Sequence, residues 1–116
     1  MQTYVINLDR RPDRRAHMEA QASARGVHVE FVSAVDMRRL ADYSGLARRR
    51  GGLRQIRDGD YACFLSHRRA WERIVARGEP FGAVLEDDVG LSADAARLLN
   101  RDDWIPPGTQ LVKLER

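Results

Sequence analysis

An apolar run at residues 81–85 leads directly into three consecutive carboxylates, Glu86, Asp87 and Asp88. A strand that is apolar at every position has both faces covered, which is typical of a parallel sheet with helices on either side. In an open α/β sheet, ligands bind beyond the carboxyl ends of the strands. This feature therefore predicts an α/β fold, with the three carboxylates at the ligand-binding edge of its sheet.

The preceding segments follow the same pattern. Residues 4–8 are a β-branched, apolar run, residues 12–25 suit a helix that Gly26 ends, and residues 28–32 alternate like a strand. A strand, a helix and a strand in about thirty residues predict a parallel unit with a right-handed crossover. The remaining predicted elements are helices at 60–77 and 93–100 and strands at 81–86 and 109–114.

The length of 116 residues fits a single domain, 1–116, that is large enough to bury a core. Residues 37–58 are rich in arginine and poor in apolar side chains, which predicts a short helix at 37–43 followed by a mobile basic loop. The expected core draws on the predicted strands and helices: Val5, Leu8, Val29, Phe31, Leu65, Ile74, Val84 and Leu85.

The net charge of +3 is compatible with an anionic partner. Nucleic acid is disfavoured, because the basic segment offers one aromatic residue, Tyr43, for stacking on bases and no nucleic-acid motif. No apolar run approaches the roughly 20 residues that span a bilayer, and there is no signal-peptide pattern. We therefore expect a cytoplasmic protein, free or peripheral to the inner face of the membrane. Cys63, the only cysteine, lies in an apolar stretch and is expected to be a small buried hydrophobe.

Three adjacent carboxylates repel one another, and each resists transfer out of water. Exposure to solvent or a bound cation relieves both the repulsion and the cost of desolvation. An oxygen-rich site of this kind suits Mg²⁺ or Mn²⁺ shared with a substrate phosphate. The residues alone leave two interpretations of Glu86, Asp87 and Asp88 about equally open, a metal site or a solvated turn that caps the next segment.

Three blocks of sequence together resemble glycosyltransferase family 25, the lipopolysaccharide-type sugar transferases. Their order and spacing make the joint match specific, and it covers essentially the whole chain, most loosely at 37–58. The blocks are residues 4–10 with 13–15 and Met18, residues 59–67 with Trp71, and residues 83–89.

This resemblance implies a Rossmann-like, GT-A-type three-layer sandwich with a mostly parallel sheet, truncated relative to the longer family members. It implies transfer of a hexose from a nucleotide-diphosphate sugar, with uridine as the base, to a lipopolysaccharide or related glycan acceptor, assisted by Mn²⁺ or Mg²⁺. The alternative is a non-catalytic nucleotide-binding remnant or docking module. Around residues 111–114 the truncated end is expected to favour self-association.

The resemblance also implies roles for single residues. Asp88 is the first choice as metal ligand, together with Glu86, and His67 and Asp87 are candidates for a catalytic role. Asp36 is equally suited to cap the helix that follows it, and His67 to be a satisfied residue bordering the core. The expected donor contacts are Asn7, Leu8, Arg10, Arg14, Asp36, Ser66, His67 and Asp87.

Overall fold

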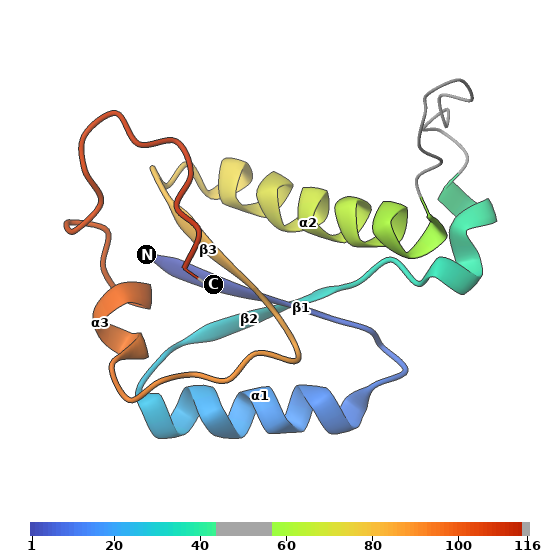
Figure 1. The fold of residues 1–116 in the computed structure, drawn as a ribbon, viewed down its shortest axis with the longest axis horizontal. Helices are drawn as coiled ribbons and strands as arrows, with labels where there is room; N and C mark the ends of the chain where they lie inside the picture. Colours follow the sequence, from blue (N-terminus) through green and yellow to red (C-terminus); the bar gives the residue numbers. More distant parts are fainter. Residues whose placement is uncertain (44–56, 115–116) are drawn as a thin grey trace.

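The structure is a computed structural model, and it describes residues 1–43 and 57–114. Three parallel strands form a sheet in the order β2-β1-β3, so that β1 (Gln2–Asn7) lies between β2 (Val29–Ser33) and β3 (Gly82–Glu86). Helix α1 (Pro12–Arg25) covers one face of this sheet and α2 (Asp58–Arg77) covers the other (Figure 1). The predicted α/β class and parallel sheet are confirmed.

Two short helices complete the described elements. The 3-10 helix η1 (Met37–Tyr43) lies between β2 and α2, as predicted, whereas residues 44–56 of the predicted basic loop lie outside the described residues. Helix α3 (Ala95–Leu99) follows β3 and is shorter than predicted. Within the described ranges, no helix combines the length and the apolar character that crossing a membrane requires.

The predicted strand at 109–114 is wrong. Residues 101–114 contain no helix or strand, and Leu111 is 85% exposed. A strand is held by the hydrogen-bond ladder that it shares with a neighbour, and the structure pairs this segment with none of the described strands.

Glycines end both long helices. Gly26 follows α1 with φ of 66°, and Gly78 follows α2 with φ of 68°. Residues with a side chain rarely adopt this left-handed conformation, so glycine is the residue that stops a helix in this way. Pro12 occupies the first turn of α1, where its missing N–H leaves no helical hydrogen bond unmade.

Side chains of successive strand residues point to opposite faces, which divides the core into two layers. On the α2 side, Tyr4 and Ile6 pack with Val32 and Ala70. On the α1 side, Ala83 packs among apolar residues of α1 and α3. Two of the predicted core residues, Val5 and Leu65, are buried, while the others are partly buried: Leu8, Val29, Phe31, Ile74, Val84 and Leu85.

Small residues line the face of α2 that meets the sheet. Ala62 and Ala70 are buried there, whereas Phe64, Trp71 and Val75 are 48%, 45% and 78% exposed on the opposite face. The rings of Phe64 and Trp71 meet edge to face, with centroids 6.2 Å apart. The helix approaches β3 so closely that a Cβ placed on Gly82 would lie 2.5 Å from Cγ1 of Ile74.

Gly82→Ala is therefore expected to push α2 away from β3 and to lower the free energy of unfolding by about 1–3 kcal/mol, as overpacked cores do. Urea denaturation followed by circular dichroism measures this change. Gly90→Ala is the matched control, because a Cβ at Gly90 meets nothing within 4 Å. In a chain that already carries Ile74→Ala, Gly82→Ala should lower the free energy of unfolding by less than it does in the native chain. Strictly additive effects of the two substitutions would contradict the clash.

Candidate functional site

The carboxyl ends of β1 and β3 bring two polar side chains together. The parallel register pairs Ile6 with Glu86, so the next residues, Asn7 and Asp87, lie side by side where the strands end. Nδ2 of Asn7 donates a hydrogen bond of 2.7 Å to Oδ2 of Asp87. The same nitrogen lies 3.2 Å from the carbonyl oxygen of Arg11 and donates to it, which fastens the turn between β1 and α1.

Asp87 is 8% exposed, yet both of its carboxylate oxygens have partners. The side-chain amide of Asn7 donates to Oδ2, and the guanidinium of Arg14 in α1 donates to Oδ1 over 2.9 Å. Hydrogen bonds from one charged donor and one amide donor offset the free-energy cost of removing this carboxylate from water. Asp87 thereby ties together β1, α1 and the end of β3.

Glu86 and Asp87 point to opposite sides of the sheet, whereas Asp87 and Asp88, in the turn after β3, both lie near the guanidinium of Arg14. Asp87 points to the α1 side, and Glu86 contacts His67 of α2 on the other side. Asp88 is 57% exposed at its side chain, with Oδ2 3.7 Å from Arg14. The predicted metal ligands Glu86 and Asp88 therefore have contacts on different elements.

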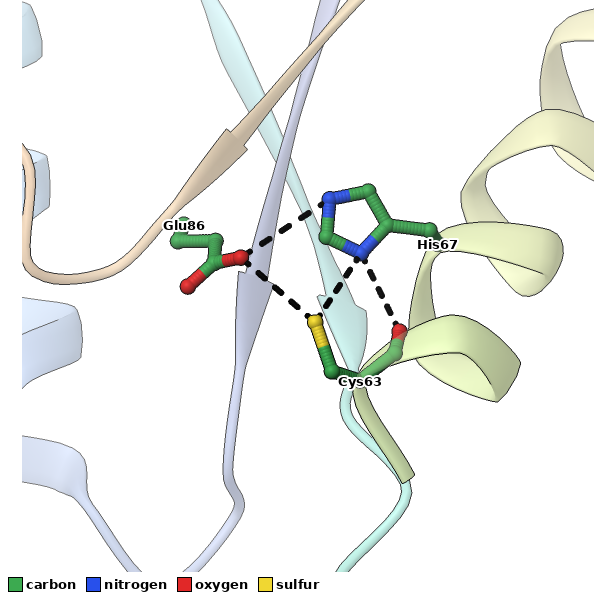
Figure 2. Close-up of side chains that lie close together, drawn as sticks. All are labelled: Cys63, His67 and Glu86. Carbon is green, nitrogen blue, oxygen red and sulfur yellow. Dashed lines mark hydrogen bonds and ion pairs between the residues drawn. The ribbon is translucent and has the colours of Figure 1, made fainter. Parts of the chain in front are cut away.

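Glu86 forms a second cluster with two residues of α2 (Figure 2). Its Oε1 lies 3.8 Å from Nε2 of His67 and 3.7 Å from Sγ of Cys63. The sulfur lies 3.7 Å from Nδ1 of His67. His67 is partly buried, in keeping with its predicted position at the border of the core.

Cys63 was expected to be buried, and that prediction is wrong: the residue is exposed. Desolvation of the sulfur, followed by the nearby Glu86 carboxylate, nevertheless raises the pKa of Cys63. Sequence reasoning missed Cys63 as a site residue. The signal that could have found it is its spacing of four residues from His67, which places both side chains on one face of a helix.

Arg10 and Asp36 form a pair beyond the ends of β1 and β2. Oδ2 of Asp36 accepts from Nε of Arg10 over 2.7 Å, and Oδ1 accepts from the backbone N–H of Arg38 over 3.0 Å. The second bond confirms the capping role that the sequence left open for Asp36. The Arg38 N–H, followed by the Arg10 side chain, lowers the pKa of Asp36 below its ordinary value of 3.8.

Ser66 is buried away from these clusters, and its hydroxyl is fully engaged. It donates to the carbonyl oxygen of Ala62 over 2.7 Å and accepts from the backbone N–H of Val35 over 2.8 Å. This serine fastens α2 to the segment after β2. Leu8 is partly buried, and its carbonyl accepts from the N–H of Arg11 over 2.8 Å.

The structure thus sorts the predicted site residues into groups at the carboxyl edge. Asn7, Arg14 and Asp87 are bonded together with Asp88 beside them, and Arg10 pairs with Asp36. His67 and Glu86 meet Cys63. Ser66 joins none of these groups.

Comparisons with known proteins show which family this chain resembles. A sequence model of glycosyltransferase family 25 (LPS biosynthesis protein) matches residues 1–105. The chain is 34% identical to the lacto-N-neotetraose biosynthesis glycosyltransferase LgtE of Neisseria meningitidis, over 90% of this chain and 38% of that protein. It is 33% identical to LgtB of Neisseria gonorrhoeae, over 99% of this chain and 44% of that protein.

A mammalian protein is also similar. The inactive glycosyltransferase 25 family member 3 of Mus musculus is 35% identical over 86% of this chain and 18% of its own length. The chain spans less than half the length of each of these three relatives.

A matched pair of substitutions tests the buried network. In Asp87→Asn one oxygen becomes an NH₂ group, so either Asn7 or Arg14 faces a donor instead of an acceptor. We expect a loss of about 1–3 kcal/mol in the free energy of unfolding. Asp88→Asn, one residue along the chain and exposed, is expected to change it by less than about 0.5 kcal/mol. Urea midpoints measure both, and equal effects would show that the Asp87 network is not stabilising.

The pH dependence of stability tests the bonds of Asp36. A carboxyl whose pKa is lowered on folding stabilises the protein above its unfolded pKa and loses that contribution as the pH falls through the folded pKa. The unfolding free energies of the native chain and of Asp36→Asn should therefore differ most above about pH 4 and converge below it. Urea titrations between pH 2 and pH 7 measure the difference, and a gap independent of pH would contradict these bonds.

Proposed function

The chain belongs to glycosyltransferase family 25, and from this premise we propose that it supplies the donor-binding region of a sugar transferase. The donor that we propose is a uridine diphosphate hexose. The acceptor is a lipopolysaccharide or a related glycan, as the names of the family and of its neisserial relatives indicate for those proteins.

The contrast between Asp87 and Asp88 carries this proposal. Asp87 is buried with both oxygens engaged, whereas Asp88 is more than half exposed at the carboxyl edge of a parallel sheet. Mg²⁺ is usually held by one or two carboxylates together with waters and substrate phosphates, and Mn²⁺ prefers the same oxygen ligands. One exposed carboxylate at this edge therefore fits a cation that arrives with a diphosphate.

In this site Asp88 would hold the divalent cation. When bound, that cation would neutralise the negative charge that develops on the departing nucleoside diphosphate. Glu86, the second expected ligand, contacts His67 on the α2 side, so we assign the donor cation to Asp88 alone among the three. For Asp87 we propose a positioning role, because it holds Arg14 beside Asp88. The Arg14 guanidinium, 38% exposed, can then contribute a second positive charge to the diphosphate.

Contacts of the donor with Leu8, Arg10 and Asp36 stay predictions. Asp36 retains a place in the proposal because acidic residues beyond a strand end accept ribose hydroxyls in dinucleotide-binding folds. A catalytic role for His67, self-association through residues 111–114 and a location in the cytoplasm or at its membrane face also stay predictions.

A second candidate function is nucleotide binding without sugar transfer. The observation that favours it is the 35% identity to the mouse relative that is named inactive. Both functions require donor binding, and they differ in turnover. Release of UDP from a UDP-hexose in the presence of a glycan acceptor would support transfer, and tight donor binding without release would support the second candidate.

Calorimetric titration of UDP into the chain, with Mn²⁺ or with a chelator, tests the proposed site. We expect binding with Mn²⁺ and at least about tenfold weaker binding with the chelator or in Asp88→Asn, because each removes one partner of the diphosphate. Asp94→Asn, an exposed aspartate at the start of α3, is the control and should bind like the native chain. Equal affinity with and without Mn²⁺ would remove the cation from the proposal, and no binding in either condition would refute donor recognition by this chain.

A further inference from the structure

Cys63, His67 and Glu86 offer three different ligand atoms to one point in space. Among residues 1–43 and 57–114, they are the one group of three or more His, Cys, Asp or Glu side chains whose ligand atoms all lie within 4.8 Å of one another. Sulfur, nitrogen and oxygen ligands together are typical of zinc sites, whereas Mg²⁺ and Mn²⁺ favour oxygen alone. The chemistry of this cluster therefore differs from that of Asp88.

The spacing of the ligand atoms fits a tetrahedral ion. Zinc bonds of about 2.3 Å to sulfur and about 2.0–2.2 Å to nitrogen and oxygen place neighbouring ligands roughly 3.4–3.6 Å apart. Oε1 of Glu86 lies 3.7 Å from Sγ of Cys63 and 3.8 Å from Nε2 of His67, and the three ligand atoms all lie within 4.8 Å of one another. Side-chain rotations close the remaining difference.

A backbone contact of His67 prepares one ring nitrogen for a ligand. Nδ1 lies 3.1 Å from the carbonyl oxygen of Cys63, and because that oxygen can only accept, Nδ1 carries the proton when they bond. The proton-free Nε2 is then the nitrogen nearest Glu86. Histidines that bind metals commonly donate their other N–H to a backbone carbonyl or carboxylate, which fixes the tautomer and the ring orientation.

Regular secondary structure positions all three side chains. Cys63 and His67 lie one turn apart on α2, and Glu86 is the last residue of β3. The two elements are packed in close contact where Ile74 of α2 meets Gly82 of β3. Ligands on rigid elements lose little freedom on binding, which favours affinity.

We propose that Cys63, His67 and Glu86 bind a thiophilic divalent cation, with Zn²⁺ as the ion that suits them best. The thiol gives up its proton to solvent as the thiolate binds. Cys63 is exposed and the Glu86 side chain is 51% exposed, so an ion reaches the site from solvent and keeps a fourth position for water or another ligand. The site is independent of the proposed donor site, which uses Asp88 beside Arg14 of α1.

Titration with Co²⁺ tests this proposal directly, because the chain has a single cysteine. A thiolate-to-cobalt charge-transfer band can come only from Cys63, and it should saturate at one ion per chain and disappear when Zn²⁺ is added. A saturating Co²⁺ complex without that band, or one ion for every two chains, would overturn the proposal.

Variants identify the other ligands. Cys63→Ser, His67→Gln and Glu86→Gln should each weaken Zn²⁺ binding in calorimetry by about 100-fold or more, while circular dichroism confirms that they fold. His17→Gln, an exposed histidine of α1, is the matched control and should bind Zn²⁺ like the native chain. Native affinity in the Cys63→Ser variant would overturn the site.

A final comparison separates this proposal from the proposed function. Asp88→Asn should leave Zn²⁺ binding unchanged while weakening Mn²⁺-dependent UDP binding, and Cys63→Ser should do the reverse. Loss of Zn²⁺ binding in Asp88→Asn would show that the two sites are one, which would overturn the independent zinc site.

Discussion

The buried charge of Asp87 is the constraint on which the carboxyl edge depends. A carboxylate that is 8% exposed is tolerated only where its oxygens find donors, and here they come from Asn7 on β1 and Arg14 on α1. Those two donors must therefore reach the end of β3 together. The parallel register supplies Asn7, and the turn after β1, fastened by Asn7 to the carbonyl of Arg11, directs the first helical turns toward Asp87. The polar edge and the βαβ unit thus stabilise each other.

The end of β3 and the turn after it give each of the three carboxylates a different environment. Glu86 meets the histidine and thiol of α2, Asp87 is enclosed by β1 and α1, and Asp88 faces solvent. The charge of Glu86 is in this way kept apart from those of Asp87 and Asp88, which both lie near the Arg14 guanidinium. One short acidic segment thus contributes to both of the sites that we propose, an oxygen-only site at Asp88 and a mixed sulfur, nitrogen and oxygen site at Glu86.

The elements with strong local patterns were predictable from the sequence. Helix α1 has Pro12 and Gly26 at its ends, and β3 has an unbroken apolar run, so local chemistry defines both. The strand predicted at 109–114 failed because its pattern does not reveal whether a neighbouring strand is present. The predicted burial of Cys63 was wrong because an apolar stretch of sequence does not show which side of a helix meets the sheet. The buried side of α2 holds Ala62, Leu65 and Ala70, and Cys63 lies outside it. For the site, the sequence placed Asn7, Arg14 and Asp87 at one edge, but the split between Glu86 and Asp88 depends on which face each side chain takes.

The exposed face of α2, which carries Trp71, has a practical consequence for fluorescence measurements on this protein. Trp71 is 45% exposed, and its ring centroid lies 6.2 Å from that of His67. A charge acquired at that distance by the imidazole, from a proton or an ion, perturbs the excited state of the indole. The other tryptophan, Trp104, donates its N–H to the carbonyls of Leu98 and Arg101, near α3. Trp71 is therefore an intrinsic fluorophore for the Cys63–His67–Glu86 cluster, and events there can be followed by emission without any attached dye.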